Sequence, residues 1–357
     1  METREPACSD HARSRLLASS SVLAGALCLS VSAILVKLAG VDAATTAMLR
    51  CAIAVVVLVP LALGERARRG RLSWRGVGGA IAAGVALGVD YAAWTAAIYE
   101  VGAGISTVLI NVQVIVLPLL ALVVDRERVT VRFLWALPLM LLGISLVGGL
   151  WGTATPRGQA VTGTLLGLLA GLGYGIYLFL TRRATKREPG RMIQPLAWAT
   201  ASAAGTTMII ALVSGGLRLA GISARSWVLL VVLAVLGQVV AWLLIHHGSI
   251  RLEPVTTAAL LLIQPVLALG LSAITLAEHP TPLQLLGAVI VVIAVALANG
   301  LLSRLRNVRD HGSRPTRPGG VSPGAEHTGA SRRYPGGQDP ADRRTCESPD
   351  PQRSGGV

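Results

Sequence analysis

The chain alternates between long apolar segments and short polar segments, and the long ones are each about 20 residues in length. A helix of about 20 residues rises about 30 Å, which matches the hydrocarbon thickness of a bilayer. Strands of a membrane barrel would instead alternate polar and apolar residues over about 10 positions, and the chain has no such alternation. The pattern predicts an all-α integral membrane protein with ten transmembrane helices, at residues 16–37, 43–63, 76–98, 102–124, 133–151, 160–181, 192–214, 226–247, 254–276 and 281–303.

The two ends of the chain are polar and are predicted to lie outside the membrane. Residues 1–15 are interpreted as a cytoplasmic tail. Residues 304–357 are basic and rich in Pro and Gly, so they are predicted to be a disordered cytoplasmic tail, with contact to anionic lipid as the alternative. A cleaved signal peptide is the alternative for the first span, but its apolar run of 21 residues exceeds the usual core of about 7–15.

Composition and charge support a membrane protein rather than a soluble one. Hydrophobic residues make up 53% and charged residues only 14%, whereas soluble domains carry about 25% charged residues. Before the C-terminal tail, 17 Lys and Arg lie in loops on one side of the predicted bundle and 4 on the other. The positive-inside rule places the basic side, with both termini, in the cytoplasm. This asymmetry accounts for the net charge of +14 without a nucleic-acid partner.

An internal repeat divides the spans into two groups of five. Residues 97–150 align without gaps on residues 248–301 after a shift of 151 positions. The identities that carry this alignment are Gln113 with Gln264, Glu127 with Glu278, and Thr130 with Thr281. Because five is an odd number, the second group must cross the membrane in the opposite sense. The sequence therefore predicts two inverted five-helix repeats, at residues 16–151 and 152–303.

Three segments carry a resemblance to a known family. They are "TAMLRCAIAVVVLVPLAL" in the second span, "YAAWTAAIYEVGAGISTVLI" leading into "VDRERVT", and "GSIRLEPVTTAALLLIQPVLALGLSAITLAEHPTPLQLLGAVIVV". The chain resembles the EamA-like transporters of the drug/metabolite transporter superfamily over about residues 16–303. Pro265, Glu278 and Gly287 match the family pattern of a helix with a central Pro, an acidic residue opening a loop, and a Gly-containing helix. In the first half Val114 takes the position of Pro265, and Pro118 comes four residues later.

The resemblance implies a secondary carrier of a bacterial plasma membrane, driven by a proton or exchange gradient. Its cargo would be a small metabolite, amino-acid-like or otherwise polar or amphipathic, moved outward by alternating access. A membrane-embedded enzyme or an accessory subunit acting on lipid-linked substrates is the alternative, and a homodimer stays open. The predicted spans and the loops between them contain no GxxxxGK[ST], HExxH, GxSxG or CxxC motif, so no ATP site, enzyme activity, cofactor or metal is predicted.

Two charged residues lie in the central part of the predicted spans. A charge at the centre of a membrane helix costs about 2.5–3.5 kcal/mol on insertion scales, so such residues default to functional hypotheses. Arg50 in the second span and Asp90 in the third are expected at similar depth, and Arg50 matches an Arg common in the resembled family. We predict that the two residues interact. A structural ion pair and a contact with solute or proton both stay open.

Polar and aromatic residues near the midplane complete the predicted solute site. Gln113 and Gln264 lie close to the centres of spans four and nine, where transporters bind their cargo, and hydrogen bonding between helices is the alternative. Pro118 and Pro265 are expected to bend these helices. Aromatic side chains are expected to line a cavity, with packing against lipid or core as the alternative. The predicted solute-binding residues are Arg50, Asp90, Tyr91, Trp94, Gln113, Trp242 and Gln264; Tyr174, Tyr177 and Trp198 are further aromatic candidates.

Other residues have expected structural roles. Lys37 is expected to extend its ammonium group to the nearby membrane surface. Glu127 and Glu278 are expected to cap following helices or close loops. The glycines at small-xxx-small spacing are expected to allow close helix packing, and they are Gly84 and Gly88 in the third span and Gly167, Gly171 and Gly175 in the sixth.

Overall fold

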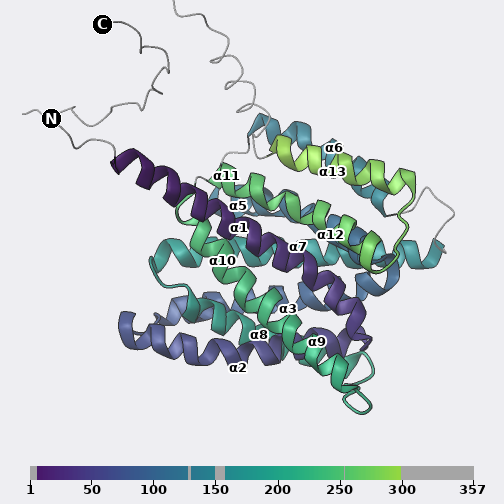
Figure 1. Ribbon diagram of the computed structural model, residues 1–357, viewed down its shortest axis with the longest axis horizontal. Helices are drawn as coiled ribbons and strands as arrows, with labels where there is room; N and C mark the ends of the chain where they lie inside the picture. Colours follow the sequence, from purple (N-terminus) through teal and green to yellow (C-terminus); the bar gives the residue numbers. More distant parts are fainter. Residues whose placement is uncertain (1–5, 128–129, 149–156, 253, 299–357) are drawn as a thin grey trace, which may run out of the picture.

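The computed structural model describes residues 6–127, 130–148, 157–252 and 254–298, and these residues form helices with no strand among them. Figure 1 shows the helices lying side by side in a bundle, with their axes near one common direction. The first half contains α1 (Pro6–Ala39), α2 (Ala43–Arg69), α3 (Trp74–Val101), α4 (Ala103–Leu109), the 3₁₀ turn η1 (Ile110–Val112), α5 (Gln113–Asp125) and α6 (Val131–Val147). The second half contains α7 (Arg157–Arg187), α8 (Ile193–Val213), α9 (Ala224–Ala234), the π segment η2 (Val235–Val240), α10 (Ala241–Ser249), α11 (Pro254–Leu261), α12 (Ile263–Thr275) and α13 (Pro282–Ala298).

Each predicted span coincides with a helical segment. Seven helical rods are long and apolar enough to cross a membrane, while α6, α12 and α13 are apolar but shorter, at 17, 13 and 17 residues. The all-helical membrane architecture is therefore confirmed, and ten crossings stay a prediction. Helix α1 begins at Pro6, well before the predicted residue 16, because Pro is favourable at the first helical position and no breaker follows. The predicted tail at 304–357 lies outside the described residues.

Glycines let the central helices approach at backbone distance. Helix α3 packs against both α7 and α8. A Cβ atom at Gly84 would lie 2.2 Å from the carbonyl oxygen of Ala199, and one at Gly173 would lie 2.7 Å from that of Ala86. A Cβ at Gly171 would lie 2.2 Å from the Val112 side chain. The packing role predicted for the glycines of the third and sixth spans is confirmed, because side chains there would fill space that other helices occupy.

Contacts between loops define the two ends of the bundle. At the first end, which we call the basic end, the Arg191 guanidinium donates to the carbonyl of Arg69, and Arg182 pairs with Glu127. At the opposite end, the Lys37 ammonium at the C-terminus of α1 donates to the carbonyl of Ile98 near the C-terminus of α3. The C-terminus of α1 thus lies at the opposite end, and the C-terminus of α7 lies at the basic end. Helices α1 and α7, which open the two predicted repeats, run in opposite directions.

Carboxylates tie the loops of the basic end together. The Glu65 side chain of α2 accepts hydrogen bonds from the backbone N–H groups at the start of α8, including that of Gln194 at 2.8 Å. An acidic group at a helix N-terminus satisfies donors that have no partner within the helix. Hydrogen bonds from Ser73 lower the pKa of the Glu188 carboxyl in the next loop. Glu65 of α2 therefore fixes the start of α8, and Ser73, the residue before α3, fixes the loop that leads into α8.

Candidate functional site

A small cavity lies in the middle of the bundle, and we call it the central cavity. Its volume is about 40 Å³, and helices from both halves of the chain contribute to its wall. The lining residues are Leu29, Ser32, Asp90, Tyr91, Trp94, Ile110, Asn111, Gln113, Tyr174, Trp242 and Gln264. Six of the seven predicted solute-binding residues are among them. The structure thus brings these residues together, while their role in binding stays a prediction.

Helix interruptions place the two glutamines at this cavity. Gln113 is the first residue of α5, directly after the 3₁₀ turn η1, and Gln264 is the second residue of α12, directly after the break at Leu262. Pro118 and Pro265 lack the N–H that would bond to the preceding turn, so each weakens the helix ladder beside these breaks. Breaks thus lie at residues 110–112 and at Leu262, before the two prolines, and a bend at Pro118 or Pro265 itself stays a prediction. Discontinuous helices of this kind line the binding sites of many secondary transporters.

Tyr91 is fixed by a hydrogen-bonded chain that joins three helices. Its hydroxyl donates to the side-chain carbonyl of Gln238, and the Gln238 amide donates to the Thr200 hydroxyl at 3.1 Å. Gln238 is fully buried within the π segment η2. A π segment inserts an extra residue into a helical turn, which rotates the side chains that follow and often occurs at functional sites. Gln238 and Trp242 are four residues apart in the sequence, and this spacing did not indicate the network.

Arg50 lies behind the cavity wall rather than in it. Its guanidinium carbon is 4.0 Å from the centroid of the Tyr91 ring and 5.4 Å from that of Trp94. Stacking of a buried guanidinium on aromatic faces contributes about 2 kcal/mol or more. Gly237 in η2 faces the guanidinium, since a Cβ there would lie 3.4 Å from it. Arg50 therefore supports the aromatic wall from outside.

Arg50 and Asp90 interact through their charges, as predicted, but they do not form a close ion pair in this conformation. Both residues are buried, at 1% and 2% exposure, but the ion pairs of 4 Å or less among the described residues do not join them. The aromatic rings of Tyr91 and Trp94 attract the guanidinium instead, and Asp90 lines the cavity. Similar depth in adjacent helices does not ensure that two side chains face each other.

Several polar atoms around the central cavity have no hydrogen-bond partner. They include Asp90 Oδ1, the indole nitrogen of Trp94 and Gln113 Oε1, which are all buried. Leaving a buried polar atom unpaired costs about 1–3 kcal/mol, and native proteins keep few of them. Asp90, Trp94 and Gln113 all line the central cavity, so two unpaired acceptors and one unpaired donor belong to its wall. This arrangement can satisfy a polar solute that carries both donors and acceptors.

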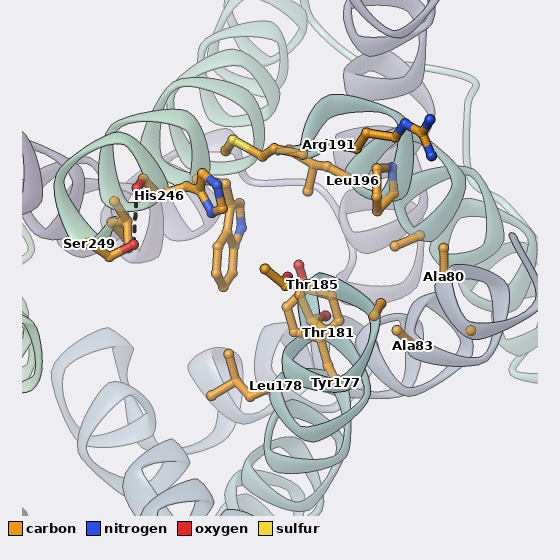
Figure 2. A pocket seen from close by; sticks show the side chains of 17 residues that line it. Ala80, Ala83, Tyr177, Leu178, Thr181, Thr185, Arg191, Leu196, His246 and Ser249 are labelled. Carbon is orange, nitrogen blue, oxygen red and sulfur yellow. Dashed lines mark hydrogen bonds between the residues drawn. The ribbon is translucent and has the colours of Figure 1, made fainter. Parts of the chain in front are cut away.

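A second cavity of about 200 Å³ lies at the basic end, and we call it the basic-end cavity. Figure 2 shows Tyr177, Thr181 and Thr185 of α7 on one side of it, with His246 of α10 across from them. Trp242 lines both this cavity and the central one. The aromatic wall between the two cavities thus includes a side chain that touches each.

The aromatic residues around Trp242 form a cluster. The Trp242 ring lies edge-on to Tyr177, with 5.5 Å between centroids, and edge-on to Tyr174, with 6.0 Å. Edge-to-face geometry is a favourable arrangement of aromatic rings. The expected aromatic lining is confirmed for Tyr174, Tyr177 and Trp242, whereas Trp198 is 47% exposed and lines neither cavity.

Comparison with known proteins agrees with this architecture. The model of the EamA-like transporter family matches residues 16–149 and 161–300. The chain belongs to the EamA-like transporter family. A solved structure titled "Crystal structure of protein" is 18% identical and has a TM-score of 0.55, over 81% of this chain and 98% of its own. That similarity concerns the fold alone, and no curated protein matches.

Some lining residues of this EamA-like transporter were not singled out by the sequence. Ser32 and Asn111 line the central cavity, although neither carries a charge or a motif. The Asn111 amide donates to the carbonyls of Thr107 and Val108, at 3.0 and 3.2 Å. It therefore satisfies carbonyl acceptors at the C-terminal end of α4. Its position within the turn that precedes Gln113 is the signal that points to it. Among the described residues, no group of three or more His, Cys, Asp or Glu side chains is placed to hold a metal ion.

Proposed function

We propose that this EamA-like transporter is a secondary carrier that binds a small polar solute in the central cavity and exports it by alternating access. The observation that carries the proposal is that three residues of the cavity wall each have a buried polar atom without a hydrogen-bond partner. A solute that pairs with Asp90, Trp94 and Gln113 would remove the cost of leaving those atoms unpaired. Amino-acid-like solutes have the mixture of donors and acceptors that this wall requires.

The arrangement of cavities supports transport between the two ends. The basic-end cavity reaches Trp242, so a solute entering from the basic end would meet the aromatic wall of the central cavity. Helices α1 and α7 run in opposite directions, as two inverted repeats require. Rocking of one half against the other would move the opening from the basic end to the opposite end. Asp90 is the carboxylate that lines the central cavity, so it is the group that we expect to bind a coupling proton.

The family assignment supports transport over the alternatives of a membrane enzyme and an accessory subunit. A proteoliposome transport assay distinguishes a transporter from a membrane enzyme and from an accessory subunit. Full-length protein in proteoliposomes should accumulate or release a labelled compound from a pool of polar metabolites, and a counterflow assay should identify it. An enzyme would convert a compound without moving it, and an accessory subunit would do neither.

Gln113→Leu and Gln264→Leu are each expected to reduce solute transport to background. Leucine fills a similar volume but removes the amide donors and acceptors that the solute needs. Abundance in the membrane should stay near that of the unmodified protein, which a fluorescent fusion would report. Gln159→Leu, on the exposed start of α7, is a matched control that should leave transport unchanged. Full transport by the double variant would remove both glutamines from the site.

The basic end is expected to face the cytoplasm because its loops carry most of the Arg residues. A cysteine at Arg187, in a background without the native cysteines, should react with an impermeant maleimide only after cells are opened. A cysteine at Leu219, in the exposed loop at the opposite end, should react in intact cells. Labelling of position 187 from outside would reverse the proposed orientation, and with it the assignment of the basic-end cavity to the cytoplasm.

A further inference from the structure

Glu278 contacts two elements of the first half of the chain, α1 and α4, at the opposite end. Its carboxylate lies 3.7 Å from the ammonium of Lys37 at the end of α1. It also accepts hydrogen bonds from the backbone N–H groups of Ala103, at 2.9 Å, and Gly104, at 3.3 Å, at the start of α4. The capping role expected for Glu278 is confirmed, but the helix that it caps belongs to the other half and does not follow it in the chain. The pairing of Lys37 with Glu278 was not expected.

Gly102 makes this approach possible. Its φ of +92° lies in the left-handed region that favours glycine. A Cβ atom at this position would lie 2.9 Å from the carboxyl carbon and both oxygens of Glu278. Helix α4 leads through η1 to Gln113, and α12, which ends before Glu278, carries Gln264. The contact of Glu278 therefore joins the two broken helices that contribute a glutamine to the central cavity.

Glu127 makes a related contact at the basic end. It lies 3.2 Å from the Arg182 guanidinium and 3.6 Å from the Lys186 ammonium, both near the end of α7. Under the shift of 151 positions, Glu127 corresponds to Glu278. Helices α1 and α7 each open one half, and Lys37 and Arg182 lie toward the C-terminal ends of these two helices. Each glutamate thus reaches from the loop before the last helix of its own half to the first helix of the other half.

The Glu278 and Glu127 contacts differ in their solvent exposure and in the number of hydrogen bonds. The Glu278 side chain is 19% exposed, whereas the Glu127 side chain is 40% exposed. Among the hydrogen bonds of the described residues, the Glu127 carboxylate accepts from Arg182 and from no backbone N–H. The basic-end cavity lies on the side of the looser contact. The tighter contact is at the end away from that cavity, although a cavity of about 240 Å³ also borders Glu278 there.

We propose that Glu278 and Glu127 are alternating latches for the two ends of the transporter. The Glu278 latch consists of Glu278, Lys37 and the start of α4, and the Glu127 latch consists of Glu127, Arg182 and Lys186. In this structure the Glu278 latch is closed and the Glu127 latch is loose. In the other state Glu278 releases α4, and Glu127 closes more tightly onto Arg182 and Lys186 near the end of α7. The proposal rests on the proposed alternating-access function.

Removing one latch should shift the population toward the state in which that end is open, because only interactions that differ between two states bias their equilibrium. Two cysteine reporters measure this shift. Ser106→Cys is buried in α4 between the Glu278 latch and Gln113. Thr181→Cys lines the basic-end cavity. The background lacks the native cysteines, which are Cys8, Cys28, Cys51 and Cys346.

The experiment uses full-length protein in lipid nanodiscs, where both faces meet the reagent. We expect Glu278→Gln to raise the rate of maleimide reaction at position 106 by roughly tenfold, the shift that loss of one charge-assisted hydrogen bond makes in an equilibrium. The rate at position 181 should fall in the same variant. Glu127→Gln should leave position 106 protected and position 181 reactive.

Two further variants separate the latch from general damage. Gly102→Ala should displace the Glu278 carboxylate and so reproduce the labelling changes expected for Glu278→Gln. It also provides an independent test of the latch if Glu278→Gln folds poorly. Gly40→Ala is the matched control, because Gly40 also has a positive φ of +63° at the same end but has nothing within 4 Å of an added Cβ. It should leave both labelling rates unchanged.

A purely static cap would give a different result. Glu278→Gln would then lower the unfolding temperature without changing either rate, or would raise both rates together, and either outcome overturns the latch. The labelling needs no identified solute, so failure of transport in the unmodified protein would refute the proposed function separately. Transport with unchanged labelling would refute the latch alone.

Discussion

Asp90→Asn is expected to reduce transport to background and to destabilise the protein. The substitution keeps the side-chain volume but removes the carboxylate from the central cavity, so neither a solute donor nor a coupling proton has its partner. It also leaves the buried Arg50 guanidinium without an opposite charge nearby. We expect a loss of about 3 kcal/mol, the low end of what breaking a buried charge pair costs, because the two groups are not in direct contact. Thermal unfolding in detergent and proteoliposome transport measure the two effects.

Arg50→Gln tests the contribution of the other buried charge, the Arg50 guanidinium. It removes the cation from the faces of Tyr91 and Trp94, and it leaves Asp90 as a single buried charge. We expect a similar loss of stability. The double variant, which carries no buried charge at this level, should recover abundance while transport stays at background. Recovery of transport in the double variant would show that both charges are structural. Normal stability and transport in both single variants would contradict any role for them.

Gly84→Leu is expected to prevent folding of the bundle. A Cβ at this position would lie 2.2 Å from the Ala199 carbonyl oxygen and 2.6 Å from the Cβ of Ser202. The first of these atoms belongs to the backbone of α8, so α3 and α8 would have to separate. Overpacking costs about 1–3 kcal/mol in cores that can adjust, and this backbone contact is expected to exceed that range. The separation would also break the hydrogen bond from Ser202 to the Ile81 carbonyl, which is 2.9 Å long.

Fluorescence-detected size-exclusion chromatography would measure the loss as a missing monodisperse peak. Gly78→Leu is the matched control on the same helix, because nothing lies within 4 Å of a Cβ added there. The control should give the same peak as the unmodified protein. A normal peak for Gly84→Leu would mean that α3 and α8 do not pack at backbone distance.

Hydropathy by itself located the helices and the depth of the critical side chains. The cost of exposing a backbone to hydrocarbon leaves few alternatives to a helix in each apolar segment, so the predicted spans coincide with helices over the residues that the structure describes. The same cost makes a charge within a span informative, and Arg50 and Asp90 are indeed buried at the centre of the structure. Regular glycine spacing likewise predicted the close packing at Gly84, since a residue without a side chain is useful where two helices touch.

Only the tertiary structure decided which groups face one another. Periodicity along a helix gives the depth of a residue, but the rotation of a helix relative to its neighbours depends on packing of the whole bundle. For this reason Arg50 meets aromatic rings rather than Asp90, and Glu278 caps α4 from 175 residues away in the chain. The chain of hydrogen bonds from Tyr91 through Gln238 to Thr200 depends on a π segment that no local pattern indicated. The residues of the site could be predicted from the sequence because polar side chains are costly within a membrane. Their contact partners could not, because those contacts form only when all the helices have packed.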